Sequence, residues 1–174
     1  MKKQHKIFTS RLCLDDIFEY AREDFTDLIS NDEISKTFIL PDFKFDDDKI
    51  ALFERLKQLS LSDERLIWGI YLENRLCGFI NEVDKSESFV EVGYVIHPSF
   101  SNRGYATEAL EAFIKEAFRL GFPTVRAGAF EENEASMKVM KKCSMKKIDH
   151  SEIIEYRGKN HNCIYYEIKR EEKA

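Results

Sequence analysis

A run of turn-forming and small residues, HPSFSNRGYATE at residues 97–108, separates two segments of different periodicity. The run before it, FVEVGYVI, has the composition of a strand, and the run after it, ALEAFIKEAFRLG, has apolar residues at helical spacing. A strand that passes through a glycine turn into a helix gathers unpaired backbone N–H groups at one point. The stretch therefore predicts a phosphate-binding site, in which Gly104 lets the backbone approach the anion and residues 105–107 supply first-turn donors.

Two common phosphate ligands fit this stretch poorly. It contains neither the G-x-x-x-x-G-K-[ST] of a P-loop nor the G-x-G-x-x-G of a dinucleotide fold. The segments before it, at residues 65–97, read as a meander of antiparallel strands rather than a βαβ unit. Nucleotide hydrolysis and hydride transfer are therefore disfavoured.

The rest of the chain alternates between strand and helix patterns. A strand is predicted at 6–14, and Asp15 or Asp16 is expected to cap a helix that continues to about residue 30. The other predicted elements are a helix at 46–60, three strands within 65–97, a helix at 106–120 ended by Gly121 and Pro123, a strand at 124–130, a helix at 134–143 and strands at 147–156 and 161–170. This order predicts an α+β or mixed α/β structure, with residues 1–174 in a single domain.

Composition excludes several functional classes. An apolar content of 43% is enough for one sizeable core, and the net charge of −5 disfavours binding to nucleic acid or anionic membranes. Arg11 interrupts the apolar start and no run reaches the roughly 18 residues of a membrane span, so we expect a soluble cytoplasmic protein. The four cysteines and four histidines lack metal-ligand spacing, which predicts reduced thiols and no metal.

Three segments resemble the GNAT superfamily of acyl-CoA-dependent N-acyltransferases. VGYVIHPSFSNRGYATEAL (92–110) is similar to the family's GY-[VWI]-hydrophobic-x-P strand and its [RQ]-x-x-G-[YI]-[AG]-[TS]-E-A pyrophosphate loop. NEASMKVMKKCSM (133–145) is similar to N-x-x-S-x-x-[VL]-x-x-K-x-G-F, and TSRLCL (9–14) resembles the first strand of the branch with the ribosomal-protein alanine N-acetyltransferases. The resemblance implies a mostly antiparallel sheet of about seven strands, flanked by about four helices.

The resemblance also implies a cofactor and the residues that hold it. The cofactor is acetyl-CoA, and the reaction is acetyl transfer to a primary amine by direct attack. The implied cofactor-binding residues are Tyr94, Val95, Ile96, Ser101, Asn102, Arg103, Gly104, Tyr105, Ala106, Thr107, Asn133 and Ser136. Ser101 stands where the family usually has Arg or Gln. Met140 stands where many members have a tyrosine that protonates the leaving thiolate, so the general acid is unassigned.

The reaction needs a base for the attacking amine. Glu91 is the first candidate, because strand alternation places it on the face of Gly93 and Val95, and Glu82 is the second. Either glutamate could instead be a solvent-facing strand residue. Asn133 could equally be an ordinary helix cap, Ser136 a first-turn serine and Arg103 a surface cation.

Other residues carry weaker hypotheses. A basic cluster, formed by Lys138, Lys141, Lys142, Lys146 and Lys147, could be a solvated face, a site for the 3′-phosphate of coenzyme A or a nucleic-acid patch. Trp68, Phe38, Phe43 and Phe45 belong either to the core or to an acceptor groove. An acetyl-cysteine intermediate at Cys143 is conceivable if neighbouring lysines lower the thiol pKa.

The acceptor is left open by the sequence. The ribosomal-protein branch favours a protein N-terminus, whereas a polyamine, an amino sugar or an antibiotic is the alternative amine. A non-catalytic acyl-CoA-binding module and an RNA-associated protein are rivals from other classes. A homodimer is common in the resembling branch, although the oligomeric state is not fixed by these residues.

Overall fold

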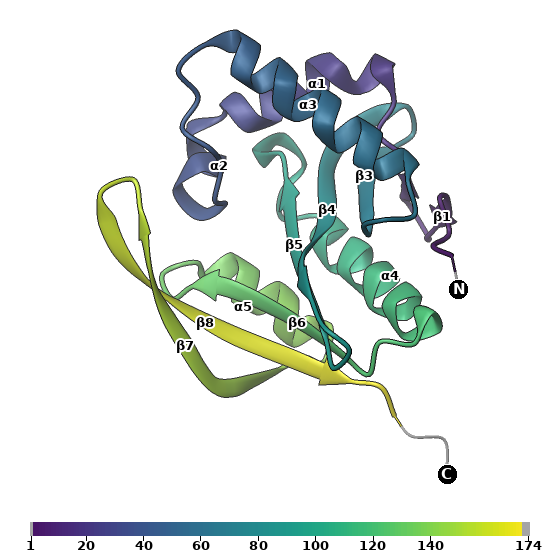
Figure 1. Cartoon of the computed structure of the whole chain (residues 1–174), viewed down its shortest axis with the longest axis vertical. Coiled ribbons are helices and arrows are strands. Elements are labelled where there is room, and N and C mark those ends of the chain that lie inside the picture. The colour runs from purple at the N-terminus through teal and green to yellow at the C-terminus, as the bar shows by residue number, and fades with distance from the viewer. Residues whose placement is uncertain (1, 172–174) are drawn as a thin grey trace.

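One mixed sheet of eight strands runs through the computed structural model, which describes residues 2–171 (Figure 1). The strand order across the described sheet is β1-β2-β3-β4-β5-β6-β8-β7, and each neighbouring pair is antiparallel except β5 and β6. The strands are β1 (Ile7–Phe8), β2 (Cys13–Asp15), β3 (Ile67–Leu72), β4 (Arg75–Lys85), β5 (Val90–Ile96), β6 (Thr124–Phe130), β7 (Lys146–Tyr156) and β8 (Lys159–Lys169).

Five α-helices flank this sheet in the described part of the chain. They are α1 (Arg22–Ser30), α2 (Asp32–Thr37), α3 (Asp46–Leu61), α4 (Tyr105–Leu120) and α5 (Glu134–Lys142), with short 3-10 turns at Glu19–Ala21 and Pro98–Phe100. The predicted mixed α/β class is confirmed, and the expected counts of about seven strands and about four helices are close to those observed. Gly121 ends α4 at a φ of 102°, as the sequence predicts.

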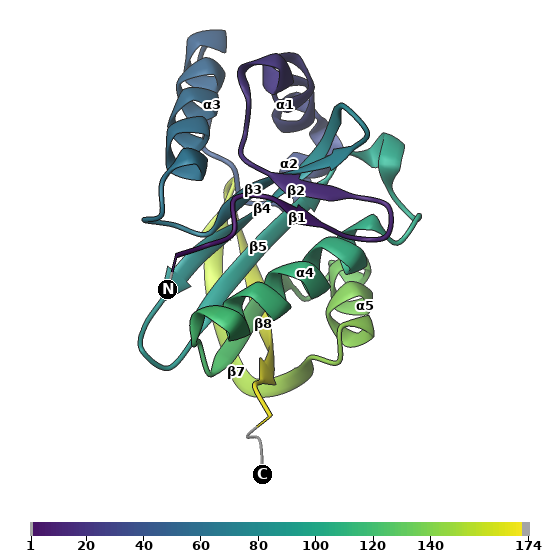
Figure 2. The ribbon, with the colours of Figure 1, turned by 90° about the vertical axis from the view of Figure 1, so that its right-hand side faces the viewer.

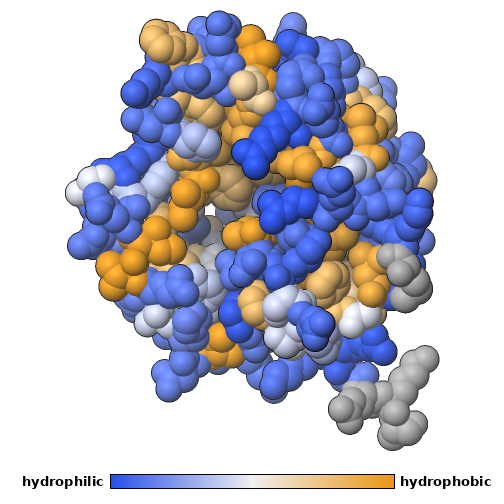
Figure 3. All heavy atoms as spheres, in the orientation of Figure 1, coloured by the Kyte–Doolittle hydropathy of each residue, from blue (hydrophilic) through white to orange (hydrophobic). Residues whose placement is uncertain are grey.

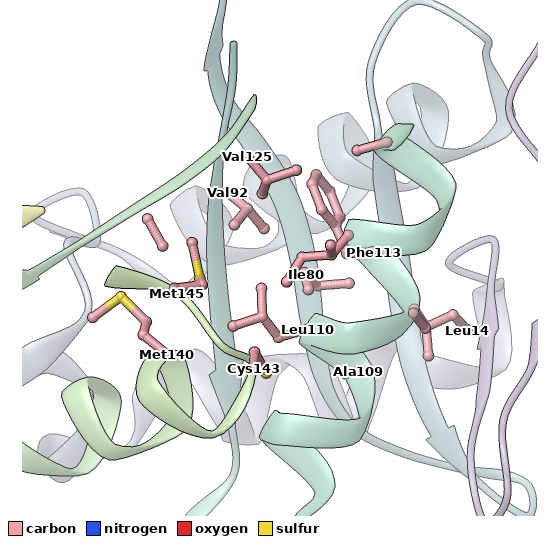
Figure 4. Close-up of a cluster of buried hydrophobic side chains, with 14 of the residues drawn as sticks. Leu14, Ile80, Val92, Ala109, Leu110, Phe113, Val125, Met140, Cys143 and Met145 are labelled. Carbon is pink, nitrogen blue, oxygen red and sulfur yellow. The ribbon is translucent and has the colours of Figure 1, made fainter. Parts of the chain in front are cut away.

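The sheet separates two hydrophobic cores. Helices α4 and α5 cover one face, where Leu110 and Phe113 pack on Ile80, Val92 and Val125 (Figure 4). The layer of α1, α2 and α3 covers the other face, where a second cluster gathers around three aromatic rings, those of Phe25, Phe53 and Phe79. Figure 2 shows the two helical layers on opposite sides of the strands. Each fully buried Leu or Phe contributes about 1.5–3 kcal/mol, so both layers are firmly attached.

The N-terminal expectations need correction. Residues 6–14 form two short antiparallel strands rather than one, because the chain turns where the Thr9 N–H donates to the Leu12 carbonyl at 2.9 Å. Asp15 does not cap a helix: it ends β2 and forms an ion pair with Lys6 at 2.8 Å. Asp16 accepts hydrogen bonds from His5 at 2.8 and 3.0 Å, and α1 begins only at Arg22.

Strands β5 and β6 diverge along their length. They pair in parallel at only three positions, Val90–Val125, Glu91–Arg126 and Val92–Ala127. Residues 93–96 of β5 remain paired with β4 on one side, while residues 128–130 of β6 pair with β8. The edge of β5 that faces β6 is therefore open from Gly93 onward, and α4 and α5 begin near this opening (Figure 1).

The β7–β8 hairpin reaches across to the helical layer beyond this opening. Its two-residue turn has positive φ at both positions, 51° at Arg157 and 73° at Gly158, as in a tight hairpin. The Tyr156 hydroxyl donates to the Phe38 carbonyl at 3.2 Å and accepts from the Leu40 N–H at 3.3 Å. The hairpin tip is thus attached to the segment between α2 and α3.

Candidate active site

A cleft of about 1430 Å³ follows the open edge of β5. One end is lined by the loop before α4 and the start of α5, and the other by the segment after α2 and by residues of β7 and β8. Figure 3 shows this face hollowed near its middle, with hydrophobic residues around the hollow. The cleft therefore offers two arms that meet at β5, which is the shape needed to bring two reactants together.

The loop at residues 101–107 forms the wall of the first arm. Asn102 has a φ of 59° and Gly104 a φ of 81°, and Gly104 is the N-cap of α4. Within residues 2–171, the backbone N–H groups of residues 102–107 donate to no acceptor, and the first α4 hydrogen bond runs from Glu108 to the Gly104 carbonyl at 3.0 Å. Six free donors beside a helix N-terminus fit a diphosphate.

Arg11 holds this loop in place, a role that the sequence alone does not predict. Its guanidinium donates from Nε to Glu108 Oε2 at 2.8 Å and from Nη1 to the Arg103 carbonyl at 2.8 Å. The same guanidinium lies 4.7 Å from the centre of the Tyr105 ring. In the sequence Arg11 belongs to TSRLCL and interrupts the apolar start, and no local pattern relates residue 11 to residue 103. By contrast, the Arg103 side chain is exposed and does not line the cleft.

Tyr94 and Ser136 meet where β5 approaches α5. The Tyr94 hydroxyl lies 2.8 Å from Ser136 Oγ and 3.2 Å from the Ser136 carbonyl oxygen. Burial raises the pKa of Tyr94, so its phenol is protonated at neutral pH. Asn133 caps α5 by accepting from the Ser136 N–H at 3.1 Å, and it also lines the cleft. The cap and the cofactor hypotheses for Asn133 are therefore compatible.

Glu91 lies on β5 where the two arms meet. Its side chain is half-buried, it lines the cleft with Gly93 and Val95, and it forms no hydrogen bond or ion pair within the described residues. Burial raises the pKa of this carboxyl, the Arg126 guanidinium opposes the rise, and the carboxylates of Asp84 and Glu152 reinforce it. A raised pKa brings a carboxylate closer to what a general base needs near neutral pH.

Comparisons with known proteins agree with this geometry. Residues 11–146 match the model of the acetyltransferase (GNAT) domain. The chain belongs to the GNAT acetyltransferase family. It is a GNAT N-acetyltransferase, and the cofactor of the family is acetyl-CoA, which the free N–H groups of residues 102–107 fit.

Relatives of this GNAT protein cover most of its length. It is 26% identical over 144 residues to the Bacillus subtilis protein named "Uncharacterized N-acetyltransferase YoaA", covering 80% of this chain and 81% of that protein. The crystal structure of a GNAT acetyltransferase from Bacillus anthracis superposes with a TM-score of 0.81 at 24% identity, over 94% of this chain and 98% of that one. The Microcin C7 self-immunity acetyltransferase MccE, solved with acetyl-CoA and AMP, superposes at 0.80 with 17% identity, over 92% and 93%.

A third solved structure is the ribosomal L7/L12 α-N-protein acetyltransferase RimL in complex with coenzyme A. It superposes on this GNAT chain with a TM-score of 0.82 at 15% identity, over 94% of this chain and 97% of that one. At these identities the solved structures share the fold with the present chain. Its acceptor is not fixed by these likenesses.

Met140 in α5 and Cys143 at its end offer no reactive group to the cleft. Met140 is fully buried among core side chains (Figure 4), so the position that often carries a tyrosine contributes nothing polar to the cleft. The condition for an acetyl-cysteine route, a Cys143 pKa lowered by neighbouring lysines, is not met. Burial, with a contribution from Glu111, raises the pKa of that thiol to about 12, and its Sγ lies 3.5 Å from the Thr107 carbonyl oxygen. A protonated, buried thiol cannot serve as the nucleophile of an acetyl-cysteine route.

Glu82 has partners that set it apart from Glu91. Its side chain is fully buried, and Oε1 lies 3.2 Å from both Arg65 Nε and Lys85 Nζ. The Leu66 N–H donates to Oε2 at 3.3 Å. Both carboxylate oxygens of Glu82 are therefore occupied by partners from the described part of the chain. Of the two candidate bases, Glu91 is the one whose carboxylate has no such partner within residues 2–171.

The remaining sequence hypotheses divide between core and cleft. Trp68 belongs to the core, because its ring is fully buried and its Nε1 donates to the Gln4 carbonyl at 2.8 Å. Phe38 lines the second arm of the cleft, the one beside β7 and β8, while Phe45 is 73% exposed. Lys138 and Lys142 line the first arm, the cofactor arm, together with the loop at residues 101–107. In residues 2–171 no helix is long and apolar enough to cross a bilayer, and no group of three or more His, Cys, Asp or Glu side chains is placed to hold a metal.

Proposed function

We propose that this protein transfers the acetyl group of acetyl-CoA directly to a primary amine, with Glu91 as the general base. The observation that carries this proposal is the unpaired, half-buried carboxylate of Glu91 beside the open edge of β5. Acetyl-CoA supplies the activated thioester. Residues 102–107 bind its diphosphate, and the open stretch at Tyr94, Val95 and Ile96 positions the pantetheine and donates a backbone N–H to the developing oxyanion.

The leaving thiolate needs a proton once the C–S bond breaks. The family tyrosine is replaced by Met140, and the paired hydroxyls of Tyr94 and Ser136 are protonated groups that lie where β5 approaches α5. Tyr94, kept protonated by burial, donates through Ser136 and recovers its proton from solvent at the cleft.

The acceptor is a primary amine of a protein N-terminus or of a small molecule. Structural likeness to the ribosomal L7/L12 acetyltransferase supports a protein N-terminus. We place this amine in the acceptor arm, the part of the cleft that is lined by Phe38 and by residues of β7 and β8.

The test has two stages. Thermal stabilisation by acetyl-CoA is measured first, and then free thiol release is followed with N-terminal peptides, polyamines and amino sugars. We expect stabilisation and amine-dependent thiol release. Stabilisation without release from any amine would leave a non-catalytic acyl-CoA-binding module, and no stabilisation would defeat the proposed cofactor site. Salt-dependent binding to RNA in place of both would favour the nucleic-acid alternative.

A further inference from the structure

Four charged residues lie in one row across the sheet. Asp84 on β4 is directly opposite Glu91 on β5, Glu91 is level with Arg126 on β6, and Arg126 is opposite Glu167 on β8. The register of β4 shifts between Glu82 and Asp84, so that Asp84 and not Val83 is the partner of Glu91, and paired residues of neighbouring strands share a face of the sheet. The row thus contains three carboxylates and one guanidinium, with two carboxylates as immediate neighbours.

Arg126, the single cation of the row, already forms an ion pair with Glu167. Arg126 donates to Glu167 Oε1 from Nε at 2.9 Å and from Nη2 at 2.7 Å, and its guanidinium lies 4.2 Å from the centre of the Phe89 ring. The cations next along β4 and before β3, Lys85 and Arg65, are bound to Glu82. Asp84 and Glu91 therefore face each other without an ion pair within residues 2–171, an arrangement that destabilises a sheet.

A third acceptor without a donor lies beside this pair. Asn81 is opposite Gly93 on the same face of β4 and β5, and its Nδ2 donates to the Glu82 carbonyl at 3.0 Å. That contact fixes the orientation of the amide and leaves Oδ1 buried with no partner. Oδ1 lies 3.6 Å from the position that a Cβ on Gly93 would take. Asn81 Oδ1 and the carboxylates of Asp84 and Glu91 are thus acceptors in need of donors, which favours a ligand rich in N–H groups.

We propose that Asp84 and Glu91 together receive the acceptor as an ammonium ion, so that Asp84 is a substrate-binding residue and positively charged amines are the preferred substrates. This inference rests on the proposed function. The ammonium gives one proton to Glu91, and the freed lone pair attacks the acetyl carbonyl carbon. The C–S bond then breaks, the nitrogen loses a second proton, and the thiolate gains one. Glu91 finally releases its proton to solvent, so one proton leaves per turnover.

Other groups near Glu91 do not replace Asp84. On β7, Glu152 is already engaged, because His150 Nε2 lies 3.1 Å from Oε1 and the Tyr165 hydroxyl donates to Oε2 at 3.1 Å. Cys163 on β8 and Glu33 on α2 line the same cleft, and Glu33 is paired with Lys36 at 2.6 Å. Among the residues that the structure describes, Asp84 accepts only the backbone N–H of Lys85, at 2.8 Å. It is the carboxylate left to meet an incoming cation.

The test compares Asp84→Asn with Glu87→Gln, which removes the same charge from the exposed turn between β4 and β5. With a peptide or polyamine that the wild type acetylates, Asp84→Asn should raise the KM for the amine about threefold to tenfold at low salt and leave the KM for acetyl-CoA unchanged. The wild type should prefer a peptide with lysine at its second position to one with glutamate there. The acidic limb of the pH–rate profile, which reports ionisation of the base, should lie at lower pH in Asp84→Asn than in the wild type, because the neighbouring charge no longer opposes ionisation of Glu91.

A second measurement does not depend on turnover. Since Asp84 and Glu91 repel each other, Asp84→Asn should melt at a higher temperature than Glu87→Gln at pH 7 without any ligand. Equal melting temperatures, or an unchanged KM for the amine and an unchanged pH profile, would overturn the proposal. Failure of acetyl-CoA to stabilise the wild type would instead defeat the proposed function, which separates the two results.

Discussion

Arg11 and Glu108 connect the first strands to the helix that opens the cofactor arm. Glu108 Oε1 accepts from the Arg11 N–H at 2.7 Å, and Oε2 lies 2.8 Å from both Nε and Nη2 of the same arginine. Because Arg11 also binds the carbonyl of Arg103, one side chain fixes both the loop and the first turn of α4. The positions of the free N–H groups therefore depend on a contact across 97 residues of sequence.

Removal of this contact should weaken cofactor binding. In Arg11→Leu the loop at 101–104 loses its support, so we expect acetyl-CoA affinity to fall roughly threefold to tenfold and stability to fall by about 1–2 kcal/mol. Isothermal titration and thermal melting measure the two effects. Arg55→Leu, at an exposed position of α3, is the matched control and should change neither. Equal affinity in the two variants would show that the loop keeps its shape without Arg11.

Low pH should weaken the contact between Arg11 and Glu108. Burial alone would raise the pKa of Glu108, but hydrogen bonds from Thr9 and Arg11 outweigh it, and the pKa lies below its ordinary value. Stability from a depressed carboxyl pKa is present above the unfolded pKa of about 4.3 and is lost as the pH falls through the folded value. The wild type should therefore lose more stability than Glu108→Gln between about pH 5 and pH 3. If the free energies of unfolding, measured by urea denaturation, fell equally in the two proteins across this range, the prediction would be contradicted.

The turn before α4 can be tested with two glycines of similar backbone conformation. Gly104 and Gly158 have φ of 81° and 73°, so a valine at either position costs about 1–2 kcal/mol in backbone strain. Only Gly104 lies at the cofactor loop, where an added Cβ would be 3.1 Å from Arg11 Nη2. Gly104→Val should reduce both stability and acetyl-CoA stabilisation, whereas Gly158→Val should reduce stability alone. Undiminished acetyl-CoA binding by Gly104→Val would place the diphosphate elsewhere.

The elements around the cofactor loop were predictable because their signals are local. The apolar stripe of α4, its end at Gly121 and the small residues before Tyr105 all belong to one continuous segment. Periodicity also placed Glu91 on the face of Gly93 and Val95, which line the cleft with it. Local patterns of this kind persist in the fold because packing agrees with them.

The features that the sequence did not predict depend on contacts between residues that are far apart in the chain. Thr9 to Leu12 gave no turn signal, so the split of the first strand was missed, and Asp15 looked like a helix cap although Lys6 pairs with it across a strand. Glu82 and Glu91 look equivalent in the sequence. They differ because Arg65 and Lys85 converge on Glu82, while Glu91 has no hydrogen-bond or ion-pair partner in the described part of the chain. Such partners are set by strand register.

Glu91→Gln separates chemistry from cofactor binding. Loss of the general base should lower kcat by roughly 10²- to 10⁴-fold and leave acetyl-CoA stabilisation intact. A carboxyl whose folded pKa is raised contributes stability below its unfolded pKa, and that contribution disappears as the pH rises through the folded value. The glutamine variant should therefore be at least as stable as the wild type at pH 7. Wild-type turnover in Glu91→Gln would exclude Glu91 as the base.

Tyr156→Phe should detach the hairpin tip from the acceptor arm. Without the hydroxyl, the buried Leu40 N–H and the Phe38 carbonyl lose their shared partner, so we expect stability to fall by about 1–3 kcal/mol. Because Phe38 lines the acceptor arm, the KM for the amine should change while the KM for acetyl-CoA, whose arm lies beyond β5, should not. Tyr20→Phe, at a 63% exposed tyrosine, is the control. Equal stability and equal amine KM in both variants would show that the bridge has no part in shaping the acceptor arm.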